Sequence, residues 1–243
     1  MTTPLRGARG PDLPYELIAG VEPCPGGWLV VSAKLQGITM SPEQPQVIRT
    51  FTDLLDYRPP FAVLGLHLPI GLPSDATPGG RSCDRQARKI LGWPRSTAVS
   101  SPPSRRDLKA WESGDSSVHG LSAITRALLP RIAEAYKDIG SYHQRTIYEV
   151  HPELGFYELN GDQPLLYSKR TSAGKQERMD LLRARMPGVE RVLTAKLRGA
   201  RLEHLVDGCA DLWTARKIAA KAITRLPENP EWDSEGLRME LVR

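Results

Sequence analysis

The chain is poor in cysteine and in aromatic residues, and it contains no long apolar run. Its three cysteines, Cys24, Cys83 and Cys209, are far apart in the sequence and odd in number. They lack the paired spacing of a zinc site, and a reduced, cytoplasmic protein fits them better than a secreted disulfide scaffold does. Because no segment approaches the roughly 20 apolar residues that span a bilayer, we expect no association with a membrane.

Several common functional signatures are also missing. Residues 1–14 lack the apolar core of a signal peptide, and we expect them to form a disordered tail. The pair Gly26 and Gly27 is not followed by the Lys-Ser/Thr of a P-loop and leads into a strand. There is no G-x-S-x-G motif, and no cysteine has a plausible histidine partner, so the usual nucleophile arrangements are excluded.

The apolar segments predict an α/β fold. Strands are expected at 16–22 and 28–35, which form a hairpin, at a short edge near Ile38, at 61–68, and in a segment that ends at Glu149. Apolar residues at helical spacing predict helices at 46–57, 82–92, 121–139, 175–186, 190–198 and 202–226. Residues 227–243 are expected to form a loop and a closing edge strand. With 40% hydrophobic residues, the chain from 15 to 243 can bury its core as one domain, built on a mixed sheet of about five strands with helices on both faces.

Residues 74–120 are rich in Pro, Ser, Gly and Arg, and we expect them to form an insertion over the edge of the sheet. Within it, residues 81–109 hold eight Lys or Arg against two acids, and this excess of six is larger than the +5 of the entire chain. Clustered basic residues suit a polyanion, although a solvated loop explains the charge equally well. The candidate phosphate-binding residues of this insertion are Arg81, Arg85, Arg105 and Arg106.

A second basic group follows the strand that ends at Glu149. It contains Lys169, Lys175 and Arg178, and His151 stands just after that strand. These residues are candidates to neutralise phosphates; the alternative is the solvated start of a helix. Trp93 and Trp111 of the insertion are candidates to stack on bases.

Acidic residues gather at predicted strand ends, where ligands collect in α/β sheets. Glu22 closes the first predicted strand and Glu149 a later one. Asp207 and Asp211 are four positions apart in the last long helix, so they share one face, roughly 5–6 Å from each other. Their mutual repulsion would be relieved by a cation, and oxygen ligands of this type suit Mg²⁺ or Mn²⁺ rather than zinc.

Each acid also has an ordinary structural explanation. Glu22 could bond to the backbone of its own turn, Glu149 could pair with an arginine, and Asp207 and Asp211 could be the solvent-facing side of an amphipathic helix. Their joint arrangement favours catalysis, because RNase H-like nucleases place acids in this layout. Two divalent ions in such a site would stabilise the attacking and leaving oxygens of a phosphodiester.

The chain resembles the family catalogued as domain of unknown function 429, which is described as predicted nucleases of RNase H-like fold. The resemblance covers the chain from about residue 18 to the C-terminus and rests on these stretches: "GVEPCPGGW", "LHLPIGLP", "RSCDRQARKILG", "YEVHPELGFYELNG", "SKRTSAGKQERMDLL", "VDGCADLWTA" and "GLRMELV". "EVHPE" and "SK-T--G--ER" have no general structural reason to occur together. The resemblance implies a nuclease that acts on nucleic acid or a nucleotide.

The sequence departs from the family pattern at several site positions. Glu22 and His67 stand where the family usually has Asp, and Glu203 and His204 stand where it often has an acidic pair. A histidine either supplies one nitrogen ligand, repels the ion when protonated, or serves only as a hydrogen-bonded structural residue. These departures weigh against two-metal chemistry.

Two hypotheses follow for the function. In the first, the protein is a phosphodiesterase dependent on Mg²⁺ or Mn²⁺, with Glu22, Glu149 and Asp207 as catalytic metal ligands and Asp211 or His67 in support. In the second, it is a weakened or inactive RNase H-like module that binds nucleic acid or a protein partner through the same cleft.

Overall fold

The computed structural model describes residues 14–115 and 120–243. The expected disordered tail, residues 1–14, lies outside the described residues except for Pro14. Among the helices in the described ranges, none combines the length and the apolar character needed to span a membrane.

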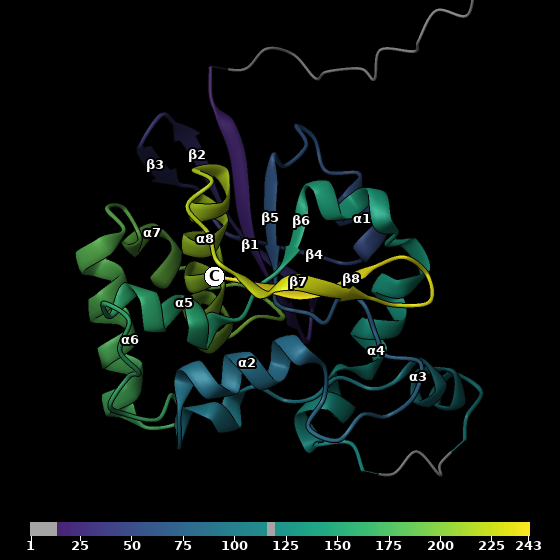
Figure 1. Cartoon of the computed structure of the whole chain (residues 1–243). Coiled ribbons are helices and arrows are strands. Elements are labelled where there is room, and N and C mark those ends of the chain that lie inside the picture. Colours follow the sequence, from purple (N-terminus) through teal and green to yellow (C-terminus); the bar gives the residue numbers. More distant parts are fainter. Residues whose placement is uncertain (1–13, 116–119) are drawn as a thin grey trace, which may run out of the picture.

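Six strands form one mixed sheet in the order β3-β2-β1-β5-β6, with β4 paired to β2 (Figure 1). Their bounds are β1 Glu16–Cys24, β2 Gly27–Gln36, β3 Thr39–Pro42, β4 Gln46–Ile48, β5 Val63–Leu66 and β6 Ile147–Glu149. β2 pairs antiparallel with β1, β3 and β4, whereas β5 runs parallel to both β1 and β6. This confirms the expected α/β fold and is consistent with RNase H-like topology.

Helices cover both faces of the sheet. The described residues contain eight α-helices: α1 Phe51–Leu55, α2 Ser82–Leu91, α3 Arg105–Glu112, α4 Ala123–Asp138, α5 Pro152–Leu159, α6 Ser172–Arg185, α7 Glu190–Leu193 and α8 Leu202–Ala219. α8 packs directly on the sheet, and with α5, α6 and α7 it encloses one apolar cluster. A second cluster lies between the other face and α1, α3 and α4. Two short 3₁₀ helices, η1 Arg95–Ala98 and η2 Ser141–Arg145, complete the helical elements described.

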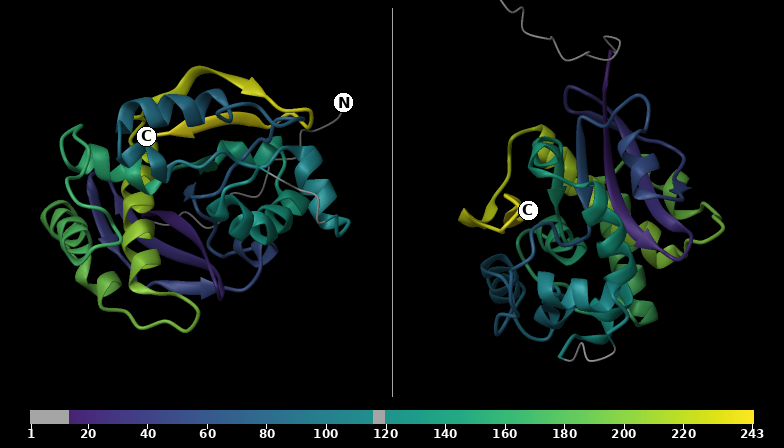
Figure 2. Two further views of the ribbon diagram at one scale, coloured as in Figure 1. Left: turned by 90° about the horizontal axis from the view of Figure 1, so that it is seen from below. Right: turned by 90° about the vertical axis from the view of Figure 1, so that its right-hand side faces the viewer.

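The C-terminal segment forms a separate hairpin, β7 Arg225–Trp232 and β8 Arg238–Val242, where the sequence predicts a loop and an edge strand of the main sheet. Figure 2 shows this yellow hairpin lying along α2. The two strands and α2 bury a third apolar cluster, which includes Leu226 and Leu241. The hairpin therefore anchors the basic insertion to the rest of the protein.

Several other elements differ from the sequence prediction. α3 and α5 form where the sequence predicts no helix, and α7 and α8 end at Leu193 and Ala219, before the predicted 198 and 226. Val47 and Ile48 share helical spacing with the residues that follow, but they pair with Leu29 and Trp28 in β4. The helix begins only at Phe51, after Thr50, whose side chain accepts a hydrogen bond from the Asp53 backbone. The hairpin turn after β1 is also tighter than predicted, because the pairing with β2 continues to Cys24↔Gly27, so Glu22 stands two residues before the end of its strand.

Candidate metal centre

The alternation of side chains along the strands brings Glu22 and His67 to one face of the sheet. Val21 pairs with Leu66 in the parallel β1–β5 ladder, so Glu22 and His67 are the next residues on neighbouring strands. The His67 N–H donates to the Val21 carbonyl, 3.0 Å away, which carries the pairing one residue beyond β5. Because Gly20 and Gly65 of the same alternating set lie against α8, Glu22 and His67 also face that helix.

Glycines allow α8 to lie close enough to the sheet to complete the group. A Cβ on Gly20 would lie 2.3 Å from both the Gly208 carbonyl oxygen and the Leu212 nitrogen. A Cβ on Gly208 would lie 2.8 Å from the Val31 side chain. Contacts this short leave no room for a Cβ at Gly20 or Gly208. The two glycines therefore allow the short distance between α8 and the sheet. Asp211, which immediately precedes Leu212, is thereby directed at Glu22.

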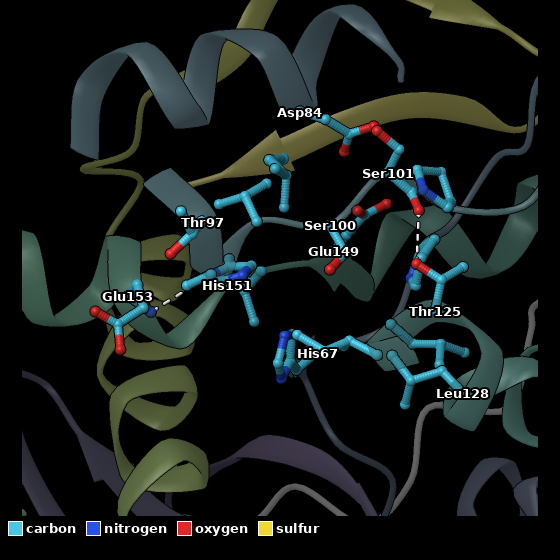
Figure 3. Close-up of a pocket in the computed structure, with 18 of the residues that line it drawn as sticks. His67, Asp84, Thr97, Ser100, Ser101, Thr125, Leu128, Glu149, His151 and Glu153 are labelled. Carbon is cyan, nitrogen blue, oxygen red and sulfur yellow. Dashed lines mark hydrogen bonds between the residues drawn. The ribbon is translucent and has the colours of Figure 1, made fainter. Parts of the chain in front are cut away.

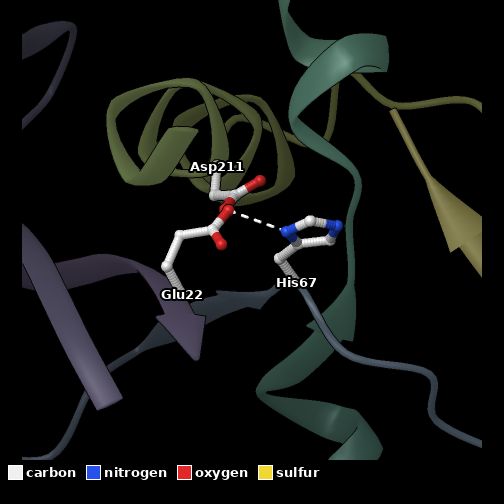
Figure 4. Close-up of side chains that lie close together, drawn as sticks. All are labelled: Glu22, His67 and Asp211. Atoms are coloured by element: carbon white, nitrogen blue, oxygen red, sulfur yellow. Dashed lines mark hydrogen bonds and ion pairs between the residues drawn. The ribbon is translucent and has the colours of Figure 1, made fainter. Parts of the chain in front are cut away.

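Glu22, His67 and Asp211 form a group that could hold a metal ion (Figure 4). One ligand atom from each residue lies within 4.8 Å of the others, and His67 Nδ1 is 2.8 Å from Glu22 Oε1. Glu22 is 4% exposed and Asp211 is fully buried. Both carboxyl oxygens of Asp211 lack a hydrogen-bond donor among the described residues. A buried carboxyl in this position favours a proton or a cation as its partner.

The electrostatics of the group follow from burial and close contact. Burial raises the pKa of Asp211 well above its ordinary value, and the nearby Glu22 carboxylate raises it further. Burial also acts to raise the pKa of Glu22, but the attraction of His67 and hydrogen bonds to His67 and Asp211 outweigh it, so the pKa is lowered. Burial opposes charge on His67, yet Glu22 leaves the pKa of the imidazole above its ordinary value. A proton and a metal ion therefore compete for this group.

Asp207 lies one helical turn before Asp211 and has a different partner. Its Oδ2 accepts a hydrogen bond of 2.7 Å from Lys169 Nζ, and its side chain is largely buried. Burial raises the pKa of Asp207, and Lys169 opposes that rise. Asp207 and Asp211 are thus not the solvent-facing side of an amphipathic helix, which was one alternative left by the sequence.

Glu149 lies on the opposite face of the sheet from Glu22. It pairs with Leu66, so its side chain shares the face of Leu66 and not that of His67. Its two oxygens accept hydrogen bonds from the guanidinium of Arg81, and Oε2 also accepts from the Ile70 N–H at 2.6 Å. Arg81 is 3% exposed and also binds Asp84. The structure thus shows the arginine pairing that the sequence left open for Glu149.

A cavity of about 490 Å³ opens beside the metal-capable group (Figure 3). His67 and Lys169 both line it, whereas Glu22, Asp207 and Asp211 are not among its lining residues. Two of these carboxylates contact a basic side chain that lines the cavity: Glu22 contacts His67, and Asp207 contacts Lys169. Arg95 and Arg170 add positive charge to the wall.

His151 lines the same cavity as an uncharged group. Its ring lies edge-on to that of His67, with 4.9 Å between centroids. Nδ1 accepts a hydrogen bond from the Glu153 N–H, so the neutral ring carries its proton on Nε2. Burial, together with the nearby His67 and Lys169, lowers the pKa of His151 well below its ordinary value.

The remaining candidate phosphate-binding residues have internal partners. Arg85 donates to the Gly80 carbonyl, and Arg105 is bound by Asp233 and Glu235. Arg106 pairs with Asp75 at the surface, where its side chain is 79% exposed. Two more residues lie in or next to α6: Lys175 pairs with Glu203 at 3.0 Å, and the buried Arg178 binds Glu153 at 2.6 Å. Of the candidate phosphate-binding residues, Arg81, His151 and Lys169 line the cavity.

Comparison with protein-family models found one match, described as "Protein of unknown function (DUF429)", over residues 20–232. The chain belongs to the DUF429 family. Neither the curated proteins nor the solved structures gave a match to this chain. The DUF429 match spans β1 through β7 and so includes every residue of the metal-capable group.

The sequence identified only part of the cavity wall, namely His67, Arg81, Glu149, His151 and Lys169. Arg95, Arg170 and the serines Ser100 and Ser101 line the cavity, but they belong to loops and to a short 3₁₀ helix. No periodicity marks such residues as neighbours. The sequence feature that could have indicated this part of the wall is the "SK-T--G--ER" stretch, whose Lys169 contacts Asp207.

Proposed function

We propose that this DUF429 protein is a divalent-metal-dependent phosphodiesterase that acts on nucleic acid or on a nucleotide. The observation that carries the proposal is Asp211, a fully buried carboxyl with no hydrogen-bond donor among the described residues. One of its oxygens lies within 4.8 Å of a ligand atom of Glu22 and one of His67, and His67 lines a cavity together with Lys169, Arg95 and Arg170. A buried carboxyl without a partner is costly, and a bound cation removes that cost.

The donor set favours Mn²⁺ over Mg²⁺. Two carboxylates and one imidazole would hold the ion, and Mn²⁺ accepts a nitrogen ligand more readily than Mg²⁺, which prefers oxygen ligands. The ion would supply a nucleophilic water at neutral pH and charge stabilisation at the phosphate. Asp207 lies one turn away on α8 and completes the acidic surroundings of the group.

The chain's own residues have distinct tasks in this proposal. Lys169, Arg170 and Arg95 attract the phosphate into the cavity, and neutral His151 offers a wall without a competing charge. Ile124 and Leu128 give the cavity an apolar side suited to a base. The sequence predicted Glu149 as a metal ligand. In this proposal its ion pair with Arg81 instead stabilises the wall of the cavity.

The experiment is cleavage of single-stranded DNA, duplex DNA, RNA and dinucleotides with Mn²⁺ or Mg²⁺, by wild type and by Asp211→Asn. We expect Mn²⁺-dependent hydrolysis by wild type and its loss in the variant. Asn is nearly isosteric and carries no charge, so the variant should fold. Cleavage that persists in Asp211→Asn would place the chemistry elsewhere.

A second candidate function is binding without catalysis. It is favoured by the internal pairing of the acids, since His67 engages Glu22 and Lys169 engages Asp207. In that case the protein would retain phosphorylated ligands in the cavity and show no metal-dependent cleavage of any of these substrates. We propose a cytoplasmic location for either function, in keeping with three free, buried cysteines.

A further inference from the structure

The "SK-T--G--ER" stretch holds one lysine in place. Six of its residues are the conspicuous positions: Ser168, Lys169, Thr171, Gly174, Glu177 and Arg178. It begins in the loop after α5 and continues through the first half of α6. Lys169 is the member that lines the cavity and contacts an acid of the site.

The backbone just before Lys169 is fixed by two residues of α6. Glu177 accepts hydrogen bonds from the Leu166 and Tyr167 N–H groups, at 2.9 and 3.0 Å. The buried guanidinium of Arg178 donates to the Tyr167 carbonyl, and its other nitrogen binds Glu153. A carboxylate and a guanidinium from one helix thus hold both polar groups of the Tyr167 backbone.

The backbone on either side of Lys169 is fixed by Ser168, Thr171 and Gly174. The Thr171 hydroxyl donates to the Ser168 carbonyl at 2.8 Å and accepts from the Gly174 N–H at 3.1 Å. A Cβ on Gly174 would lie 2.0 Å from the Ser168 oxygen, so only glycine lets the loop approach the helix this closely. Arg95 of η1 holds the Tyr167 carbonyl from across the cavity.

Lys169 brings a positive charge to Asp207, the acid of α8 that is not part of the metal-capable group. Its ammonium lies 2.7 Å from Asp207, and its charge also acts on Glu22. Asp207 is four positions from Asp211 on the same helix, so the two acids are neighbours on one helix face and their charges repel each other. Lys169 supplies beside Asp207 the positive charge that a cation would otherwise supply.

Building on the proposed function, we propose that Lys169 takes the place of a second metal ion, so that the site binds a single divalent ion and presents the ammonium to the substrate phosphate. The hydrogen bonds that fix the backbone around Lys169 would then keep its ammonium between Asp207 and the cavity. A fixed ammonium stabilises negative charge on a phosphate without the cost of reorganising at each turnover.

The test is the number of Mn²⁺ ions bound per chain, measured by isothermal titration calorimetry on wild type, Lys169→Met and Lys169→Arg. We expect one ion in wild type, two in Lys169→Met because Asp207 becomes free, and one in Lys169→Arg. Lys137→Met, which removes an exposed lysine of α4, is the matched control and should bind one ion. Circular dichroism establishes that each variant is folded.

Cleavage rates provide the second readout. Lys169→Met should lose about 100-fold or more in rate, the typical effect of removing one preorganised charge-stabilising group. Glu177→Ala, which releases the Leu166 and Tyr167 backbone without touching the site, should fall between wild type and Lys169→Met.

The outcomes separate this inference from the proposed function. If Lys169→Met binds one Mn²⁺ with unchanged affinity, the inference is overturned, whatever the activity of wild type. If wild type cleaves nothing but the ion count rises from one to two in Lys169→Met, Lys169 does replace a cation and only the nuclease proposal fails. If neither wild type nor Lys169→Met binds Mn²⁺, both the inference and the proposed function fail.

Discussion

Glu22 lies in β1 and His67 directly follows the parallel strand β5; they are 45 residues apart in the sequence, yet Glu22 Oε1 is 2.8 Å from His67 Nδ1. The ladder places them side by side, and α8 adds the buried carboxyl of Asp211 to the pair. The result is a group with two acids and one histidine that either a proton or a metal ion can satisfy.

Metal binding should stabilise the folded protein through Asp211. Mn²⁺ at 100 times its dissociation constant should raise the free energy of unfolding by about 2.7 kcal/mol, because the ion binds the native state only. Asp211→Asn should show no such gain while remaining folded without metal. Thermal unfolding with increasing Mn²⁺ measures both, and an equal stabilisation of the variant would mean that the ion binds elsewhere.

The pH dependence of stability should have opposite signs without and with metal. Glu22 raises the pKa of His67 above its ordinary 6.5, so the stabilisation from the charged pair is complete below about pH 6.5 and is lost as the pH rises through the folded pKa. Metal must displace that proton, so the gain from Mn²⁺ grows over the same interval.

Urea unfolding from pH 5.5 to 8.5 measures these two slopes. Without metal, the free energy of unfolding should decline above about pH 6.5, and His67→Gln should lose the histidine's share of that decline. A stabilisation by Mn²⁺ that did not change with pH would show that His67 is not a ligand.

Removal of Arg81 should destabilise the protein strongly. Arg81→Met leaves the carboxylates of Glu149 and Asp84 buried without their partner, and breaking such a pair costs about 3–5 kcal/mol. The double variant Arg81→Met/Glu149→Gln should recover part of the loss. Arg106→Met, which removes an exposed pair with Asp75, should change urea unfolding little.

The contact between α8 and the sheet should not tolerate a methyl group at Gly20. Gly20→Ala would place Cβ 2.3 Å from backbone atoms of α8, so helix and strand must separate. We expect a loss of about 1–3 kcal/mol or more, as for other overpacked cores, together with weaker Mn²⁺ binding, because Asp211 moves away from Glu22. Gly140→Ala meets only a His143 nitrogen at 4.0 Å and serves as the control for urea unfolding and calorimetry.

Binding of polyanions should depend on the residues that line the cavity. Arg170→Glu should weaken binding of a single-stranded oligonucleotide and reduce the slope of log affinity against log salt by about 1. Lys137→Glu, on the exposed side of α4, should leave the slope unchanged. The sequence alone predicts a similar loss on charge reversal of Arg105 and Arg106; because Arg105 is held by Asp233, Arg106→Glu is the variant that tests the outer face of the insertion.

The sequence by itself determined the class of fold and singled out most of the acids of the candidate site. Apolar runs and helical spacing marked β1, β2, β5 and α8, because burial on one or both faces imposes a period on the residues. Strand-end position singled out Glu22 and Glu149, and spacing paired Asp207 with Asp211. His67 stood out because the family usually has Asp at this position, and in the structure it binds Glu22.

Only the tertiary structure decided which of these residues meet. Glu22 and Glu149 both lie near the ends of apolar strands, yet the register of the parallel ladders sends them to opposite faces, one towards α8 and the other towards Arg81. Register between distant strands is not encoded in local periodicity. The basic residues were even less predictable, since Arg81 and Arg105 are buried in ion pairs whereas Lys169 reaches the site. A charge on a side chain is visible in the sequence, but its partner is set by packing between segments that lie far apart along the chain.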